Sequence, residues 1–309
     1  MAFKSGFVAI VGRPNAGKST LVNTLVGRKV SIVSSRPQTT RNRIQGIVNR
    51  HDAQIVLVDT PGIHKPDSIL NRQMMDEVTQ AVEGIDVLTL IADATSSDMG
   101  PGDRFTLEWI RRFQGPVFLL LNKIDRMRKQ MLLPVIDRFH REFEFTEVFP
   151  ISAITGAGCP ELVKAWLAHL PEAPPSFPVD QFTDQPERFL AAEIVREKAI
   201  VATKDEVPHA IAVLVDSFDE TEKLIRIRAT VYVERDGQKG ILIGKRGETM
   251  KKIGTEARKE LESILGAHIF LELFVKVQPN WRQNAAVVKQ LDWHRQLDEL
   301  AKNQEGLGT

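Results

Sequence analysis

Residues 12–20, GRPNAGKST, constrain the fold of this chain more than any other stretch of its sequence. They fit the pattern G-x-x-x-x-G-K-[ST], with the apolar run FVAIV before them and a helix-like segment after them. Such a loop lets backbone N–H groups surround phosphates at the N-terminus of a helix. We predict that Lys18 reaches the β- and γ-phosphates of a nucleotide and that the Ser19 hydroxyl ligates Mg²⁺. The loop residues expected at the nucleotide are Gly12, Arg13, Pro14, Asn15, Ala16, Gly17, Lys18, Ser19 and Thr20.

The first 170 residues alternate short apolar runs with longer amphipathic segments. Strands that are separated by helices pair in parallel and are covered by those helices on both faces. The sequence therefore predicts an α/β domain with a mostly parallel sheet. Its strands are expected at residues 7–11, 53–59, 86–93, 117–122 and 147–152, and helices at residues 19–25, 70–82 and 103–113.

The tetrapeptide DTPG (residues 59–62) directly follows the second of these apolar runs. Asp59 is expected at the carboxyl end of its strand, where it can hold the second coordination shell of the metal. Thr60 and Pro61 complete the turn, and the backbone N–H of Gly62 can then sense a γ-phosphate.

Two further motifs select guanine as the base. NKID follows another apolar run, and its Asp125 can accept from both guanine N1–H and the exocyclic amine, which adenine cannot match. The other base contacts are expected from Asn122 and Lys123 of the same motif and from Ser152, Ala153 and Ile154, with the Ala153 N–H donating to guanine O6. Motifs in this order, each after its own strand, are typical of P-loop GTPases over residues 6–170.

The segment PQTTRNR (residues 37–43) lies where GTPases have their first switch. Thr39 or Thr40 would complete the Mg²⁺ shell in the GTP state; we favour Thr40, although the sequence does not separate them. Ile63 follows DTPG, where Ras-like enzymes have a catalytic Gln, so unassisted hydrolysis should be slow. The residues predicted to act in hydrolysis are Lys18, Thr40, Asp59 and Gly62.

Asn15 and His64 each allow more than one interpretation. Some GTPases with Asn at the position of Asn15 use it to hold K⁺ against the phosphates, and the alternative is a hydrogen bond that stabilises the loop. We expect a structural or solvated role for His64 rather than that of a general base.

Residues 171–186, PEAPPSFPVDQFTDQP, contain five prolines and are predicted to be a semi-rigid linker. Beyond the linker the pattern becomes α-β-β-α-α-β, and residues 224–231 alternate between a polar and an apolar face. We therefore divide the chain into a nucleotide-binding domain (1–170), the linker, a second domain (187–279) and a C-terminal helical tail (280–309).

Basic charge is concentrated in one part of the second domain. The whole chain has a formal net charge of only +1, whereas residues 235–259 carry eight basic and three acidic side chains. At their centre lies ILIGKRG, in which two glycines enclose Lys245 and Arg246. Such a loop before a helix suits a phosphate backbone, since glycines allow close approach and helix N–H groups can meet phosphate.

The combination of GRPNAGKS, QTTR, DTPGIH and NKID with ILIGKRG resembles the Era family of bacterial GTPases. The resemblance implies GTP or GDP and Mg²⁺ as ligands and a type II KH domain, whose loop Gly244, Lys245, Arg246 and Gly247 clamps four nucleotides of single-stranded RNA, with Lys251 and Lys252 beside it. It further implies binding near the 3′ end of small-subunit ribosomal RNA, a role in rRNA maturation and in assembly of the small ribosomal subunit, and peripheral association with the inner membrane.

The remaining features indicate the compartment. The single cysteine, Cys159, allows no intramolecular disulfide, and no stretch approaches the roughly 20 apolar residues of a membrane span. We expect a cytoplasmic monomer. The alternative function is a GTPase that regulates cell-cycle or membrane partners through a KH fold used for docking.

Overall fold

The computed structural model describes residues 2–221 and 224–293, which fall into two compact units. The first unit consists of residues 2–66 and 73–185, and the second consists of residues 67–72 and the described residues from Pro186 on. Each unit has its own sheet and its own hydrophobic core. No helix in the described part of the chain is long and apolar enough to cross a membrane.

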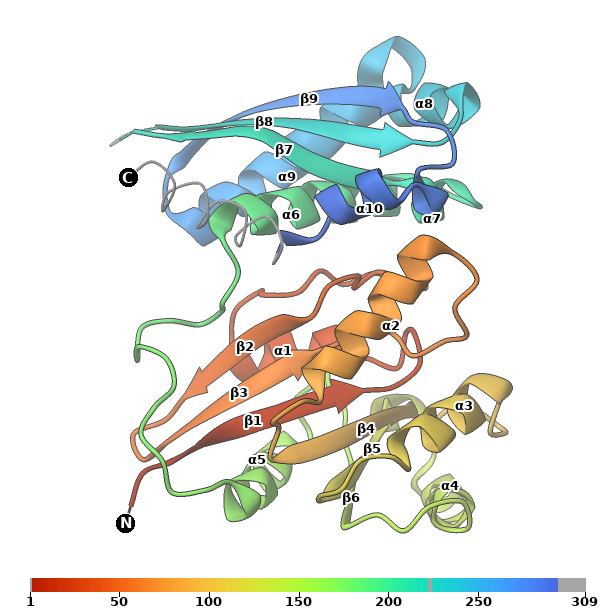
Figure 1. Cartoon of the computed structure of the whole chain (residues 1–309), viewed down its shortest axis with the longest axis vertical. Coiled ribbons are helices and arrows are strands. Elements are labelled where there is room, and N and C mark those ends of the chain that lie inside the picture. Colours follow the sequence, from red (N-terminus) through yellow and green to blue (C-terminus); the bar gives the residue numbers. More distant parts are fainter. Residues whose placement is uncertain (1, 222–223, 294–309) are drawn as a thin grey trace. The chain divides into compact units, whose positions relative to one another are not determined.

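The first unit contains a six-stranded sheet in the order β2-β3-β1-β4-β5-β6 (Figure 1). All neighbours pair in parallel except β2, which is antiparallel to β3. This confirms the predicted mostly parallel sheet and adds one strand, β2, that the sequence interpretation omitted. The strands are β1 (Lys4–Val11), β2 (Ile44–Asn49), β3 (Ala53–Asp59), β4 (Val87–Asp93), β5 (Val117–Asn122) and β6 (Glu147–Pro150).

Helices cover both faces of this sheet because successive strand residues point to opposite sides. In β1, Val8 and Ile10 enter the core under one set of helices, and Ala9 and Val11 enter the core under the other. The first core is covered by α1 (Lys18–Val26) and α5 (Cys159–His169). The second is covered by α2 (Ile69–Ala81), α3 (Pro101–Ile110) and α4 (Leu132–His140). Two short 3₁₀ turns, η1 (Ile124–Arg126) and η2 (Lys129–Met131), precede α4.

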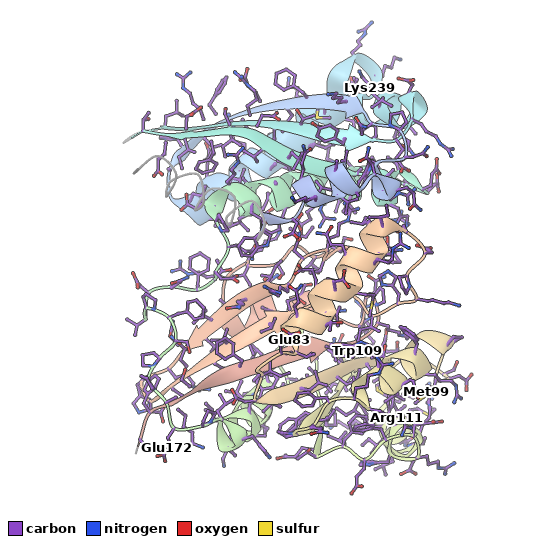
Figure 2. All side chains as sticks on the ribbon, in the orientation of Figure 1. Glu83, Met99, Trp109, Arg111, Glu172 and Lys239 are labelled. Atoms are coloured by element: carbon purple, nitrogen blue, oxygen red, sulfur yellow. The ribbon has the colours of Figure 1, made fainter. Side chains whose placement is uncertain are left out.

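The Pro-rich segment lies against the first unit, where the sequence predicted a linker that belonged to neither domain. Glu172, labelled in Figure 2, pairs with Lys4 in an antiparallel bridge. The side chain of Gln54, which is fully buried, accepts hydrogen bonds from the backbone of Ser176 and Phe177. Backbone N–H groups of non-proline residues in this segment thus bond to the first unit. The exact division into domains stays a prediction.

The second unit has the predicted order α-β-β-α-α-β with two added short helical pieces, α7 and η3. A three-stranded sheet has the order β7-β8-β9, with β7 antiparallel and β9 parallel to the central strand. Its elements are α6 (Glu187–Ala202), α7 (Val207–Ala210), β7 (Ala212–Glu220), β8 (Leu224–Val233), α8 (Asp236–Ile243), η3 (Lys245–Gly247), α9 (Glu248–Leu265) and β9 (His268–Val277).

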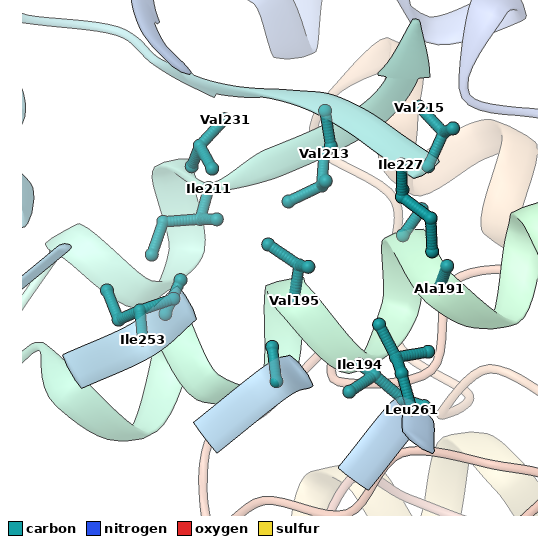
Figure 3. Close-up of a cluster of buried hydrophobic side chains, with 14 of the residues drawn as sticks. Ala191, Ile194, Val195, Ile211, Val213, Val215, Ile227, Val231, Ile253 and Leu261 are labelled. Atoms are coloured by element: carbon teal, nitrogen blue, oxygen red, sulfur yellow. The ribbon is translucent and has the colours of Figure 1, made fainter. Parts of the chain in front are cut away.

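One face of the second sheet is packed against α6 and α9. The predicted apolar face of β8, which includes Ile227 and Val231, is buried and meets Val195 of α6 and Leu261 of α9 in a single core (Figure 3). The segment after β9 forms η4 (Trp281–Gln283) and α10 (Ala285–Gln290). The predicted helical spacing through Leu297 and Leu300 lies outside the described residues.

Candidate nucleotide and RNA sites

The loop between β1 and α1 has a backbone that only glycine fits at two positions. Gly12 and Gly17 have φ values of 155° and 106°. A Cβ atom at Gly12 would lie 2.3 Å from the Ile91 carbonyl oxygen, and one at Gly17 would lie 2.1 Å from Asn122 Nδ2. The sequence pattern is therefore imposed by close approach of the loop to β4 and β5.

Lys18 is buried and points back onto its own loop. Its Nζ donates to the carbonyl oxygens of Gly12 and Arg13, each at 3.1 Å. Burial lowers the pKa of Lys18 to about 8, an effect that the nearby Asp59 carboxylate opposes. A phosphate that reached this ammonium would supply the negative charge that its buried position lacks.

Hydroxyl and carboxylate oxygens meet at the start of α1. The Ser19 and Thr40 hydroxyls are 2.9 Å apart, whereas Thr39 is engaged elsewhere and donates to the Arg36 carbonyl oxygen at 2.7 Å. Asp59 is fully buried, and within the described residues neither of its carboxylate oxygens has a hydrogen-bond partner. Burial raises the pKa of Asp59, and the charge of Lys18 counteracts the rise.

This donor set fits Mg²⁺. The ion prefers oxygen ligands, usually keeps several water molecules, and can use a carboxylate through those waters. An orphaned buried carboxylate beside two hydroxyls that already lie together is the arrangement that such a hydrated ion would complete.

Asn122 connects three motifs of the base-binding side. Its Nδ2 donates to the Ala16 carbonyl oxygen at 2.8 Å, and its Oδ1 accepts from the Ala153 N–H at 2.9 Å. Asp125 accepts from the Ser152 hydroxyl at 2.6 Å, which orients the carboxylate expected to read guanine. The Ala153 N–H is thus already bonded, so a guanine O6 would have to share it with Asn122.

Lys123 has a left-handed backbone and a fixed side chain. Its φ is 71°, and its Nζ lies 2.6 Å from Asp93 Oδ2 at the end of β4. Burial opposes ionisation of Asp93, but hydrogen bonds from Lys123 and Thr95 hold the pKa of this carboxyl below its usual value. The lysine is therefore held in place across the carboxyl ends of two parallel strands.

These motifs surround one cavity of about 440 Å³. Of the predicted residues, Pro14, Asn15, Gly17, Lys18, Ser19, Thr20, Thr40, Gly62, Asn122, Lys123, Asp125, Ala153 and Ile154 line it. Gly12, Arg13, Ala16, Asp59, Thr60, Pro61 and Ser152 are not among the lining residues. The sequence interpretation missed the contribution of residues 32–35, which could have been found because they lie between the loop helix and Thr40.

Arg13 directs its side chain away from the cavity. Its guanidinium pairs with Asp103 at 3.2 Å and donates to the Ser96 hydroxyl at 2.5 Å. The backbone carbonyl, which accepts from Lys18, is the part of Arg13 that faces the site. Arg13 thus supports the loop from behind.

Asn15 links the phosphate loop to the first switch. It has a φ of 63°, and its Nδ2 donates to the Ser35 carbonyl oxygen at 2.8 Å. The loop-stabilising bond considered from the sequence is therefore present. Its Oδ1 is the atom that a K⁺ ion would use.

The side chain at residue 63, in the turn after β3, cannot orient a water molecule. Ile63 is 1% exposed and packs in the core under α2, and His64 Nδ1 lies 2.6 Å from the Gly62 carbonyl oxygen. A Cβ atom at Gly62 would lie 2.6 Å from Pro14 Cγ, so the turn approaches the phosphate loop closely.

The Gly-x-x-Gly loop joins α8 to α9 through η3. Gly244 has a φ of 73°, and a Cβ atom there would lie 2.2 Å from Thr249 Oγ1. Lys245 and Arg246 are exposed at the tip of the loop, and Arg246 has a φ of 55°. Lys251 and Lys252 are exposed in the first turns of α9, so all four basic side chains are available to an anionic partner.

A contact that the sequence did not suggest fixes the base of α8, the helix that carries Lys239 (Figure 2). The Arg282 guanidinium forms two bonds to the Glu234 carboxylate, at 3.2 and 2.6 Å. Trp281 is fully buried and donates to the Ala210 carbonyl oxygen at 2.8 Å. Trp281 is therefore part of the core packing of the second unit.

Comparison with known proteins places both units in described families. Residues 7–123 match the family of 50S ribosome-binding GTPases, and residues 206–282 match the KH domain family. A crystal structure of Era in complex with MgGDPNP and nucleotides 1506–1542 of 16S ribosomal RNA is 44% identical, with a TM-score of 0.89; the match covers 94% of this chain and 98% of that one. A variant of Aquifex aeolicus Era bound to GDP and AlF₄⁻ is also 44% identical, with a TM-score of 0.89 and coverage of 94% and 99%.

Proposed function

The chain belongs to the Era family of GTPases, and we propose that it is a GTP-hydrolysing switch that binds the 3′ end of small-subunit ribosomal RNA and assists maturation and assembly of the small ribosomal subunit. One observation carries the proposal: the same chain has a cavity lined by all the guanine-nucleotide motifs and an exposed basic Gly-x-x-Gly loop in a KH domain.

We propose that Lys18 leaves the carbonyl oxygens of its own loop and binds the β- and γ-phosphates of GTP. Ser19 and Thr40 would hold Mg²⁺, and we assign this role to Thr40 rather than Thr39 because its hydroxyl already lies 2.9 Å from that of Ser19. When bound, the metal neutralises charge on the phosphates. Asp59 would accept hydrogen bonds from its water ligands.

Ile63 cannot orient the attacking water, so hydrolysis by the isolated protein should be slow. The water must be placed by backbone groups such as the Gly62 N–H, by a cation or by a partner. Asn15 is the residue that would hold K⁺ near the phosphates, and its bond to Ser35 would bring the first switch to the same place.

In the KH domain, the backbone of Gly244 and Gly247 would let an RNA strand approach, and Lys245, Arg246, Lys251 and Lys252 would bind its phosphates. The exposed positions of these four side chains support the assignment. Each phosphate contact that is lost should reduce the salt dependence of binding, by about 0.7 log unit of slope for single-stranded RNA.

The test is binding of a labelled RNA with the sequence of the 3′ end of 16S rRNA, measured by fluorescence anisotropy at several salt concentrations. The variant Lys245→Gln with Arg246→Asn removes two charges, and Asn tolerates the left-handed backbone at Arg246. The control, Lys129→Gln with Lys164→Gln, removes two exposed charges from the first unit. Equal binding and equal salt slopes for the two double variants would refute the RNA site.

We further propose that the protein acts as a monomer in the cytoplasm and associates peripherally with the inner membrane. The membrane part is supported by the family resemblance. Analytical ultracentrifugation tests the oligomeric state, and flotation with anionic vesicles tests membrane association. Sedimentation as a dimer, or absence of the protein from the floated fraction, would refute the respective statement.

A further inference from the structure

The segment 182–185, which we call the strap, pairs with β2 through one antiparallel bridge. Thr183 forms an antiparallel bridge with Gly46, and the Phe182 carbonyl oxygen accepts from the Ile47 N–H at 2.9 Å. The Thr183 hydroxyl donates to the Gln45 carbonyl oxygen at 2.8 Å. The Gln45 N–H in turn donates to Asp184 Oδ1 at 3.0 Å.

The end of the strap reaches the other side of the first switch. Gln185 is 8% exposed, and its Nε2 donates to the Val30 carbonyl oxygen at 2.7 Å. Val30 is itself fixed, because its N–H and that of Ser31 both donate to Asn23 Oδ1 of α1 at 2.9 Å. Gln185 is therefore attached to a point that the phosphate-loop helix holds.

The strap thus connects the two ends of the first switch. Val30 precedes the segment that carries Thr40, and Gln45 follows it. The same region contacts the helix after the DTPG turn, because the Arg43 N–H donates to Glu77 Oε2 of α2 at 2.9 Å. Any movement of the switch that shifts Val30 relative to Gln45 must stretch or break the bonds of the strap.

A single residue, Pro186, lies between the strap and helix α6 in the sequence. Pro186 follows Gln185 directly and caps α6, which begins at Glu187. The pyrrolidine ring fixes φ of Pro186, so this connection has one fewer rotatable backbone angle than another residue would give it.

We propose that Thr183 and Gln185 are positioning residues that hold the first switch in the GTP state and couple this state to RNA binding by the KH domain. The inference rests on the proposed function and adds the physical connection between its two activities. The GTP state orders switch segments through contacts of the γ-phosphate and the metal. The strap would then be fully bonded with GTP and partly released with GDP.

The experiment compares RNA affinity with a non-hydrolysable GTP analogue and with GDP, using the full chain. The ratio for the unmodified protein is expected to lie in the usual range of about 5–150 for allosteric coupling. Thr183→Val removes the hydroxyl at nearly constant shape and should bring the ratio close to 1, while GDP affinity stays within a few-fold. Thr183→Ser keeps the hydroxyl and should keep the ratio.

The outcomes separate the strap from the proposed function. Equal RNA affinity in both nucleotide states of the unmodified protein would refute nucleotide-dependent RNA binding, and the role of the strap would be refuted with it. A normal ratio in the unmodified protein that persists in both Thr183→Val and Gln185→Met would overturn the strap role alone.

A measurement on the unmodified protein covers the case in which these variants do not fold. The Gln45 and Ile47 amides, which bond the strap, should exchange hydrogen more slowly with the GTP analogue than with GDP. Identical exchange of both amides in the two states would overturn the proposal.

Discussion

Replacing Asp184 by Asn should make the first unit more stable at neutral pH and leave it unchanged near pH 4. Burial raises the pKa of Asp184 from 3.8 to about 6. Hydrogen bonds from the Gln45 and Asp184 backbone and the charge of Arg43 oppose this rise, and the Glu77 carboxylate adds to it. Asn keeps a carbonyl oxygen for the Gln45 N–H but has no charge to bury.

The sign follows from proton binding. Between pH 4 and 6 the folded protein holds the Asp184 proton while the unfolded chain releases it, so stability is lost as the pH rises through this window. A difference of about two pKa units corresponds to about 3 kcal/mol, because one unit is worth about 1.4 kcal/mol. Above pH 7, the free energy of unfolding of Asp184→Asn should therefore exceed that of the unmodified protein by up to about 3 kcal/mol. For a unit of this size, this corresponds to a rise of roughly 6–12 °C in the unfolding midpoint.

The assay is thermal or urea unfolding of both proteins from pH 4 to 8, reported as their difference so that other titrating groups cancel. Asp180→Asn is the control, because Asp180 lies in the same segment but is exposed. An Asp184→Asn variant that is no more stable than the unmodified protein at pH 8 would refute the reasoning. So would a stabilisation of equal size at pH 4.

The other predictions concern nucleotide and RNA. Asp125→Asn should weaken GTP binding and admit xanthosine triphosphate, as measured by competition; retained guanine preference would contradict the base assignment. Lys18→Ala should abolish most nucleotide binding, whereas His64→Ala should keep the hydrolysis rate within a few-fold of the unmodified protein. Loss of turnover by His64→Ala with intact nucleotide binding would identify His64 as the missed catalytic group. Replacing K⁺ by Na⁺ should slow phosphate release if Asn15 holds the ion, and equal rates would leave Asn15 its bond to Ser35 alone. Gly247→Asp should abolish RNA binding in a filter assay. The variant should still fold, because no atom lies within 4 Å of the added Cβ and the left-handed backbone costs about 1–2 kcal/mol. Full RNA affinity would argue against a clamp at this loop.

The sequence predicted those features whose cause is local. The phosphate loop, DTPG and NKID are contiguous patterns, and each follows a strand that its apolar residues reveal. The alternation of polar and apolar residues over 224–231 also predicted a strand, and its apolar face is the one that is buried in β8. Parallel strands end at one edge of a sheet, so the motifs after them were expected to converge on a single site.

The features that were missed depend on contacts between distant residues. β2 contains a glycine and no strong alternation, and it is stabilised by β3 on one side and by the strap on the other. The Pro-rich segment suggested a linker by its composition, but the fully buried side chain of Gln54 offers an amide that binds its backbone. Arg13 belongs to the phosphate loop by sequence, yet Asp103, ninety residues later, determines where its side chain points. No local periodicity encodes such pairs.

The two halves of the nucleotide cavity are held in different ways, and this restricts where a switch can act. On the base side, the Asn122 side chain bonds both the phosphate loop at Ala16 and the last strand end at Ala153, and these bonds hold the two segments together. On the phosphate side, a single contact between hydroxyls joins Thr40 to Ser19. Lys18 is held by hydrogen bonds to carbonyl oxygens of its own loop. A γ-phosphate would therefore rearrange the phosphate side while the base side keeps its geometry. The strap is attached at both ends of the segment that carries Thr40, which is the part of the cavity free to respond.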